Sequence, residues 1–168
     1  AIDSYHDLRT SFMFGVGAGG DKQDWIVSDN GENEDLSWDP IWEVKTTIDD
    51  LGWNAEMKIP LNQLRFKDGN NIIWGLNIMR QIYRINEMSL WDHIPKDAAG
   101  WVSESGELHG LNLKSKNQLD IRPFLTTSMN TYESVANNPY KDGKDTNFDG
   151  GLDAKFGITN DLILDLTF

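Results

Sequence analysis

Oxygen-bearing side chains alternate in a short run near the C-terminal end of the chain. Asp145, Asn147 and Asp149 are followed by Gly150, which is the pattern that opens a calcium-binding loop. A complete loop of this kind places a bidentate carboxylate at its twelfth position, where this chain has Phe156. The run therefore has two interpretations, a candidate calcium site at Asp145, Asn147 and Asp149 or a turn-rich loop that binds no ion.

The remaining polar residues form no catalytic constellation in the sequence. The glutamates that a hydrolase would need, Glu43 and Glu107 among them, are not spaced as a facing pair. The histidines share no metal-ligand spacing, and no serine-nucleophile motif accompanies them: His6, His93 and His109. The absence of cysteine excludes disulfides, zinc–thiolate sites and cysteine nucleophiles. The acidic stretch 29–35 is either a second cation site or a solvated loop.

The composition limits the classes of partner and favours β-structure. Twenty-seven acidic and 15 basic residues give a formal charge of -12, so nucleic acid is not an expected partner. Fifteen glycines and 18 aromatic residues (7 Trp, 7 Phe and 4 Tyr) favour short strands joined by turns. No apolar stretch approaches the roughly 18 residues that a membrane-spanning helix requires. We therefore expect an all-β protein.

Alternating apolar and polar residues predict the strands of the first two thirds of the chain. The clearest prediction is a hairpin in which residues 42–48 and 53–59 pair across the turn at 49–52. Pro60 ends the second strand, and a single helical turn is expected at 61–64. The longest apolar run, 72–83, suits one central strand of a β-sandwich. Shorter strands are expected at 11–16 and 25–27, with a polar loop at 28–35.

The last fifty residues show a more regular alternation. A long extended segment at 119–129 precedes a polar loop at 130–149, and strands at 152–158 and 162–168 flank a tight turn at 159–161. Long and short connections between amphipathic strands are typical of a membrane β-barrel. The leucines and Phe168 would then face lipid, and Asp153, Lys155 and Asp165 the lumen. A half-buried hairpin of a soluble domain shows the same alternation, so the pattern leaves both open.

Several local motifs occur in an order that resembles one family: Tyr5–Thr10, Leu36–Trp42, Gly52–Pro60, Leu64–Phe66, Trp74–Asn77, Gly106–Leu111 and Gly150–Thr159. They resemble bacterial envelope proteins in which a β-sandwich like a family 9 carbohydrate-binding module precedes an outer-membrane β-barrel of unknown function. The resemblance implies a partial sandwich over 1–113, a linker at 114–118 and the start of a barrel at 119–168. It also implies that both ends are internal to a longer outer-membrane protein whose N-terminal domain lies in the periplasm.

The resemblance further implies where a sugar would bind. The binding modules hold a sugar against tryptophan, and one such position matches Trp101, with Asp92 and Asn77 as candidate polar contacts. Two positions depart from the pattern, because Met79 replaces a polar residue and Gly15 a basic one. The other tryptophans that alternate in strands are expected to pack in the core: Trp38, Trp42, Trp53 and Trp74.

The function implied is therefore non-catalytic. The expected roles are glycan recognition, or support of transport or assembly at the outer membrane. The expected partners are glycans, outer-membrane lipid and other envelope proteins, and no cofactor is expected apart from the candidate calcium ion. Two alternatives stay open: an accessory domain of a glycoside hydrolase, and a scaffold that docks envelope proteins through its open sheet edges.

Overall fold

The computed structural model describes the chain except for residues 115–118, 135, 137, 139, 141 and 160–161. Strands account for 57% of the protein, and all of the strand pairs are antiparallel in the part described, which confirms the all-β prediction. The chain divides into two units, Ala1–Lys116 and Asn117–Phe168. The first unit ends within the predicted linker 114–118, of which residues 115–118 lie outside the described part of the chain.

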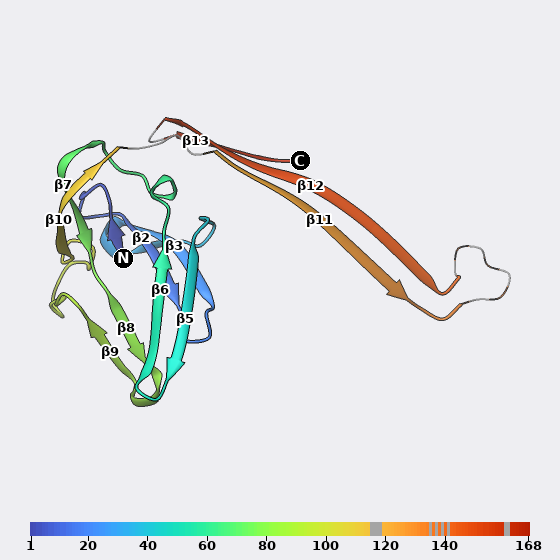
Figure 1. The fold of residues 1–168 in the computed structure, drawn as a ribbon, viewed down its shortest axis with the longest axis horizontal. Helices are drawn as coiled ribbons and strands as arrows, with labels where there is room; N and C mark the ends of the chain where they lie inside the picture. The colour runs from blue at the N-terminus through green and yellow to red at the C-terminus, as the bar shows by residue number, and fades with distance from the viewer. Residues whose placement is uncertain (115–118, 135, 137, 139, 141, 160–161) are drawn as a thin grey trace. The chain divides into compact units, whose positions relative to one another are not determined.

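The first unit is built on a six-stranded antiparallel sheet (Figure 1). Its strand order is β10-β7-β1-β2-β3-β4. The strands are β1 (Ile2–Asp3), β2 (Ser11–Val16), β3 (Lys22–Ser28), β4 (Asn33–Asp35), β7 (Gly69–Leu76) and β10 (Gly106–Leu113). Short 3-10 helices lie at η1 (Asp29–Gly31), η2 (Leu61–Gln63) and η3 (Tyr83–Ile85), and η2 confirms the helical turn predicted at 61–64. The C-terminal end of β7 pairs with the N-terminal strand β1, through Leu76 and Gly75.

Apolar side chains cover both faces of this sheet, because the residues of β2 alternate between two clusters. Phe12 packs with Leu64, Phe66 and Trp74, and Trp38 joins this cluster 5.0 Å from the Phe12 ring. Met13 points the other way and packs with two residues that are fully buried, Val27 and Val102. A single sheet thus lies between two small cores. The residues that cover it, among them Trp38, Leu64, Phe66 and Val102, come from loops.

Three of the four tryptophans predicted to be core residues are packed as expected. Trp42 and Trp74 are buried, and Trp38 packs against Phe12. Trp53 is only half-buried, and the Arg80 guanidinium lies 6.0 Å from the centre of its ring. Trp53 therefore joins two hairpins through a cation–π contact and does not fill a closed core.

Two hairpins extend from the first unit, each forming a two-stranded sheet (Figure 1). The pairing of β5 (Glu43–Asp49) with β6 (Gly52–Lys58) confirms the predicted hairpin. The Asp49 carboxylate accepts hydrogen bonds from the amides of Leu51 and Gly52, which closes the turn. The second hairpin pairs β8 (Met79–Ile82) with β9 (Glu87–Leu90). Apolar side chains on both stay exposed, including Ile48, Leu51 and Tyr83.

Two predictions about continuity in the first unit are wrong. The single strand expected over 72–83 ends at Leu76 and resumes at Met79, because the side chain of Asn77 turns inward and bonds to the backbone of another segment. The polar loop expected at 28–35 contains η1 and then β4, whose three residues pair with the end of β3. A strand of three exposed polar residues carries no apolar alternation from which it could be predicted.

The second unit is a three-stranded sheet in the order β11-β12-β13. Its strands are β11 (Leu119–Thr131), β12 (Lys144–Thr159) and β13 (Leu162–Thr167). The twenty-residue loop predicted at 130–149 is wrong, because the β11–β12 ladder continues to the pair Thr131 and Lys144. Polar residues in this stretch alternate with Met129 and Phe148, so they line one face of a strand. Residues 160–161 of the predicted turn lie outside the described residues.

Candidate functional site

Asn77, a predicted sugar contact, lies fully buried between two segments of the first unit. Its side-chain oxygen accepts hydrogen bonds from the amides of Asp92 (3.1 Å) and Ile78 (2.9 Å), and its Nδ2 donates to the Asp92 carbonyl (3.2 Å). These bonds hold the segment after β9 against the end of β7. Asn77 therefore positions Asp92 and its neighbours, and its own amide faces protein backbone.

Trp101, the predicted stacking residue, is half-buried against the cluster that contains Met13, Val27 and Val102. Its ring lies over Gly31, where an added Cβ would come within 2.2 Å of the indole Nε1. The amide of Asn30 fixes the same loop, because its Oδ1 accepts from the Ser103 amide (2.9 Å) and its Nδ2 donates to the Ser103 hydroxyl (3.0 Å). Trp101 thus packs the loop before β10 against η1.

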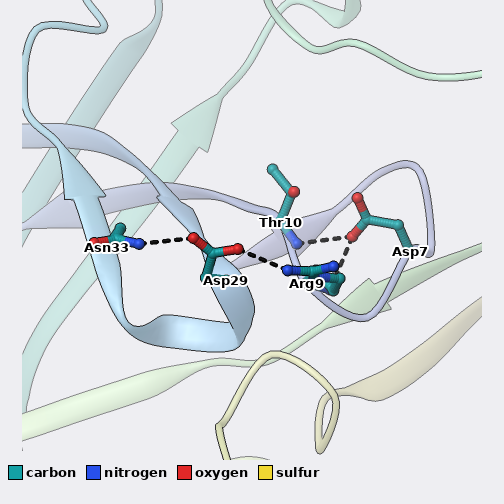
Figure 2. Close-up of polar contacts among 5 residues, drawn as sticks. All are labelled: Asp7, Arg9, Thr10, Asp29 and Asn33. Atoms are coloured by element: carbon teal, nitrogen blue, oxygen red, sulfur yellow. Dashed lines mark hydrogen bonds and ion pairs between the residues drawn. The ribbon is translucent and has the colours of Figure 1, made fainter.

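The acidic stretch at 29–35 takes part in a network of polar contacts through Asp29 (Figure 2). The Asp29 carboxylate lies between two side chains and accepts from the guanidinium of Arg9 and from the amide of Asn33, both at 2.7 Å. Further along, hydrogen bonds from the Ser37 hydroxyl and amide lower the pKa of the exposed Asp35 carboxyl. Among the described residues, no group of three His, Asp or Glu side chains could hold a metal ion. The Asp29 carboxylate is therefore occupied by protein donors.

Trp91 is an exposed aromatic residue that sequence reasoning did not single out. It is 58% exposed, and its ring lies with the Asp92 carboxylate over Gly106, where an added Cβ would come within 2.6 Å of Trp91 and 2.7 Å of Asp92. The Asp92 carboxylate also accepts from the His93 amide at 2.8 Å. Trp91 directly follows a strand and precedes a loop that holds Pro95 and Gly100, and this position was the only signal in the sequence. Trp91 and Asp92 therefore present an aromatic face beside an acceptor.

The calcium-like run lies in strand β12, not in a loop. Asp145, Asn147 and Asp149 pair with Asn130, Ser128 and Thr126 of β11 and occupy alternate positions on one face. Alternate residues of an extended strand are roughly 6.6 Å apart, whereas a calcium loop folds its ligands around one point. In this conformation the three side chains form a polar row.

Charge is segregated between the two faces of the second unit. The ladder places seven of the eight charged residues of β11, β12 and β13 on one face, and Lys144 is the exception. Opposite charges meet on this face: Arg122 pairs with Asp153 across the ladder, and Lys155 forms an ion pair with Asp165 at 3.5 Å. The seven residues are Asp120, Arg122, Asp145, Asp149, Asp153, Lys155 and Asp165.

The opposite face of the same sheet is apolar and exposed. Leu125 is 77% exposed and Phe168 is 76% exposed. The pairing register and the alternation along the strands place further large apolar residues on this face, including Leu119, Ile121, Met129, Phe148, Leu152, Phe156, Ile158, Leu162, Leu164 and Leu166. Phe124 and Ile163 depart from the pattern by lying on the charged face, where the Phe124 ring covers Gly151. The second unit is therefore an amphipathic sheet whose apolar side is uncovered.

Comparison of this chain with models of protein families, with curated proteins and with solved structures finds no match. None of the helices in the described part of the chain is long and apolar enough to cross a membrane.

Proposed function

We propose that this chain is a non-catalytic part of an outer-membrane protein, in which a periplasmic β-domain resembling a carbohydrate-binding module leads into the first strands of a membrane β-barrel. The observation that carries the proposal is the segregation of charge in the second unit. One face has exposed leucine and phenylalanine side chains and no charge except Lys144 at its end, whereas the other has seven charged side chains. Lipid-facing and lumen-facing residues alternate in this way in a membrane barrel.

The length of the strands is consistent with this role. A barrel strand needs about 9–11 residues, tilted by about 45°, to cross the hydrocarbon layer. β11 has 13 residues and β12 has 16. At about 3.3 Å per residue and this tilt, β11 would span roughly 30 Å. In this arrangement Arg122, Lys155 and their aspartate partners would line the lumen, where water solvates the charges.

Single-cysteine labelling tests the membrane assignment, because the natural chain has no cysteine. An environment-sensitive fluorophore would be attached at Ile121, Leu125 or Met129 on the apolar face, and at Thr126 or Ser128 on the charged face. With the full-length protein in phospholipid vesicles, we expect quenching by a lipid-soluble quencher at the first three positions and by a water-soluble quencher at the other two.

A matched control for the labelling experiment lies in the first unit. Ile48 of the β5–β6 hairpin is also an exposed apolar residue on an alternating strand, at 72% exposure. A fluorophore on Ile48→Cys should respond only to the water-soluble quencher. Equal responses along β11, or lipid quenching at position 48, would contradict the proposed division between a membrane unit and a periplasmic unit.

The exposed Trp91 favours glycan recognition as the role of the first unit. The C–H faces of sugars pack on aromatic rings, and a neighbouring carboxylate can accept from sugar hydroxyls. We infer that Trp91 and Asp92 are the sugar contacts, with Asn77 holding Asp92 in place and Trp101 supporting the loop before β10. This assignment keeps Asp92 from the sequence prediction and moves the stacking role from Trp101 to Trp91.

Calorimetric titration of the protein with a panel of oligosaccharides, at millimolar concentration, tests this assignment. Trp91→Ala is expected to weaken binding by about 1–2 kcal/mol, which is about five- to thirtyfold. Tyr83→Ala is the matched control, because Tyr83 is an aromatic residue at 88% exposure in the β8–β9 hairpin. No heat with any sugar, or equal losses in both variants, would contradict the assignment.

A further inference from the structure

Trp91 and Asp92 lie side by side because the residue next to both of them is glycine. An added Cβ at Gly106 would lie 2.6 Å from the Trp91 ring and 2.7 Å from Oδ2 of Asp92. Both distances start from the same point, so the ring and this carboxylate oxygen are separated by no more than their sum. The aromatic ring and the carboxylate can therefore contact the same small group of a ligand.

The Asp92 carboxylate has one oxygen that remains able to accept from a ligand. Its Oδ1 accepts from the His93 amide at 2.8 Å, whereas Oδ2 accepts no hydrogen bond from the residues that the structure describes. Within the same described residues, no lysine, arginine or histidine forms an ion pair with Asp92. A carboxylate of this kind is a favourable acceptor for a positively charged donor.

Both residues are held in place before any ligand binds. The buried Asn77 side chain bonds to the backbone amide of Asp92 at 3.1 Å and to its carbonyl at 3.2 Å. The Trp91 amide donates to the Ile78 carbonyl at 2.8 Å. Binding would therefore order few additional groups, so that little of the interaction energy is lost to conformational entropy.

An ammonium group is the ligand group that suits both side chains. The face of a tryptophan ring attracts cations, and a hydrogen bond from an ammonium to a carboxylate is about twice as strong as one between neutral groups. A neutral hydroxyl or amide gains less from either side chain. The formal charge of -12 acts in the same direction, because an acidic protein attracts cations.

We propose that Trp91 and Asp92 recognise an amino sugar, a glycan unit that carries a free, protonated amine. This inference rests on the proposed glycan-binding role of the first unit and names the class of glycan. The C–H face of the sugar would pack on the Trp91 ring, and its ammonium would donate to Oδ2 of Asp92. Glycans whose nitrogen is acetylated would bind less tightly, because acetylation replaces the ammonium with a neutral amide.

Two oligosaccharides that differ in acetylation of the nitrogen test the proposal, the tetramer of glucosamine and the tetramer of N-acetylglucosamine. The protein would be titrated with each in a calorimeter at about pH 5.5, where amines are protonated and carboxyl groups are ionised. We expect the glucosamine tetramer to bind about tenfold more tightly, through the combined effect of an exposed ion pair and an exposed cation–π contact.

The variant Asp92→Asn should remove most of this preference, because asparagine keeps the shape and a hydrogen-bond acceptor but loses the charge. Its affinity for the acetylated tetramer should stay within about twofold, which checks that the site is still folded. Trp91→Ala, by contrast, should weaken the binding of both tetramers. Asp97→Asn is the matched control, because Asp97 is an exposed carboxylate between the same two strands, and both affinities should stay within about twofold.

The outcomes separate this inference from the proposed function. If the acetylated tetramer binds as tightly as the glucosamine tetramer, the amine preference is wrong and the glycan-binding role stands. If neither tetramer binds, the preference is also wrong, and the absence of heat with every other oligosaccharide of the panel would contradict the glycan-binding role as well. An equal loss of preference in Asp92→Asn and Asp97→Asn would overturn the inference, because the net charge of the protein would then attract the amine.

Discussion

Asn77→Ala is expected to lower the free energy of unfolding of the first unit by about 2–4 kcal/mol. The Asn77 side chain is fully buried and satisfies both the amide and the carbonyl of Asp92, as well as the amide of Ile78. Alanine would leave these backbone groups without their partners in a site that excludes water. An unsatisfied buried polar group costs about 1–3 kcal/mol, and more than one is created here.

Urea unfolding followed by tryptophan fluorescence measures this effect, since all seven tryptophans lie in the first unit. Asn54→Ala is the matched control, because Asn54 is exposed on β6, and we expect a change within about 0.5 kcal/mol. Asn77→Asp would keep the acceptor but place a carboxylate against the Asp92 carbonyl. It should therefore destabilise the protein at least as much as alanine at neutral pH. Equal midpoints for Asn77→Ala and Asn54→Ala would show that these bonds contribute little.

Asn77 also illustrates which parts of the fold the sequence could predict. Alternation identified the β5–β6 hairpin and the amphipathic strands of the second unit, because period-two patterns are local. The break at Asn77 depends on Asp92, which is fifteen residues away, and no local pattern contains that partner. Most residues at 72–83 are apolar, and this local pattern favours one continuous strand. The hydrogen bonds between Asn77 and Asp92 override that local preference.

The same holds for the candidate sites: local sequence patterns predict which face of a strand a residue occupies, but not which distant residues fold against it. Trp101 and Trp91 both lie next to loops, and the sequence does not show that one ring packs on Gly31 while the other stays exposed. Likewise, the three histidines share no spacing, yet folding brings His6 and His109 to the same carboxylate. In the second unit, by contrast, the alternation alone assigned Asp153, Lys155 and Asp165 to one face, and the pairing register confirms that grouping.

In the second unit, Leu125→Arg is expected to destabilise the vesicle-inserted protein by about 2–4 kcal/mol, the cost of an arginine near the middle of the lipid face of a barrel. Leu125 is the central residue of β11 and is 77% exposed on the apolar face. The neighbouring Thr126 lies on the charged face opposite Asp149, so Thr126→Arg would gain a carboxylate partner across the ladder. The two variants add the same charge one residue apart.

Denaturant titration of both full-length variants in phospholipid vesicles, followed by circular dichroism, compares their stabilities. If the apolar face contacts lipid, Leu125→Arg should lose stability while Thr126→Arg stays near the natural protein. If the sheet instead lies in water, both positions are solvated and the two variants should differ by less than about 1 kcal/mol. The difference between adjacent positions therefore tests the environment of each face directly, because strand propensity and net charge change almost equally in the two variants.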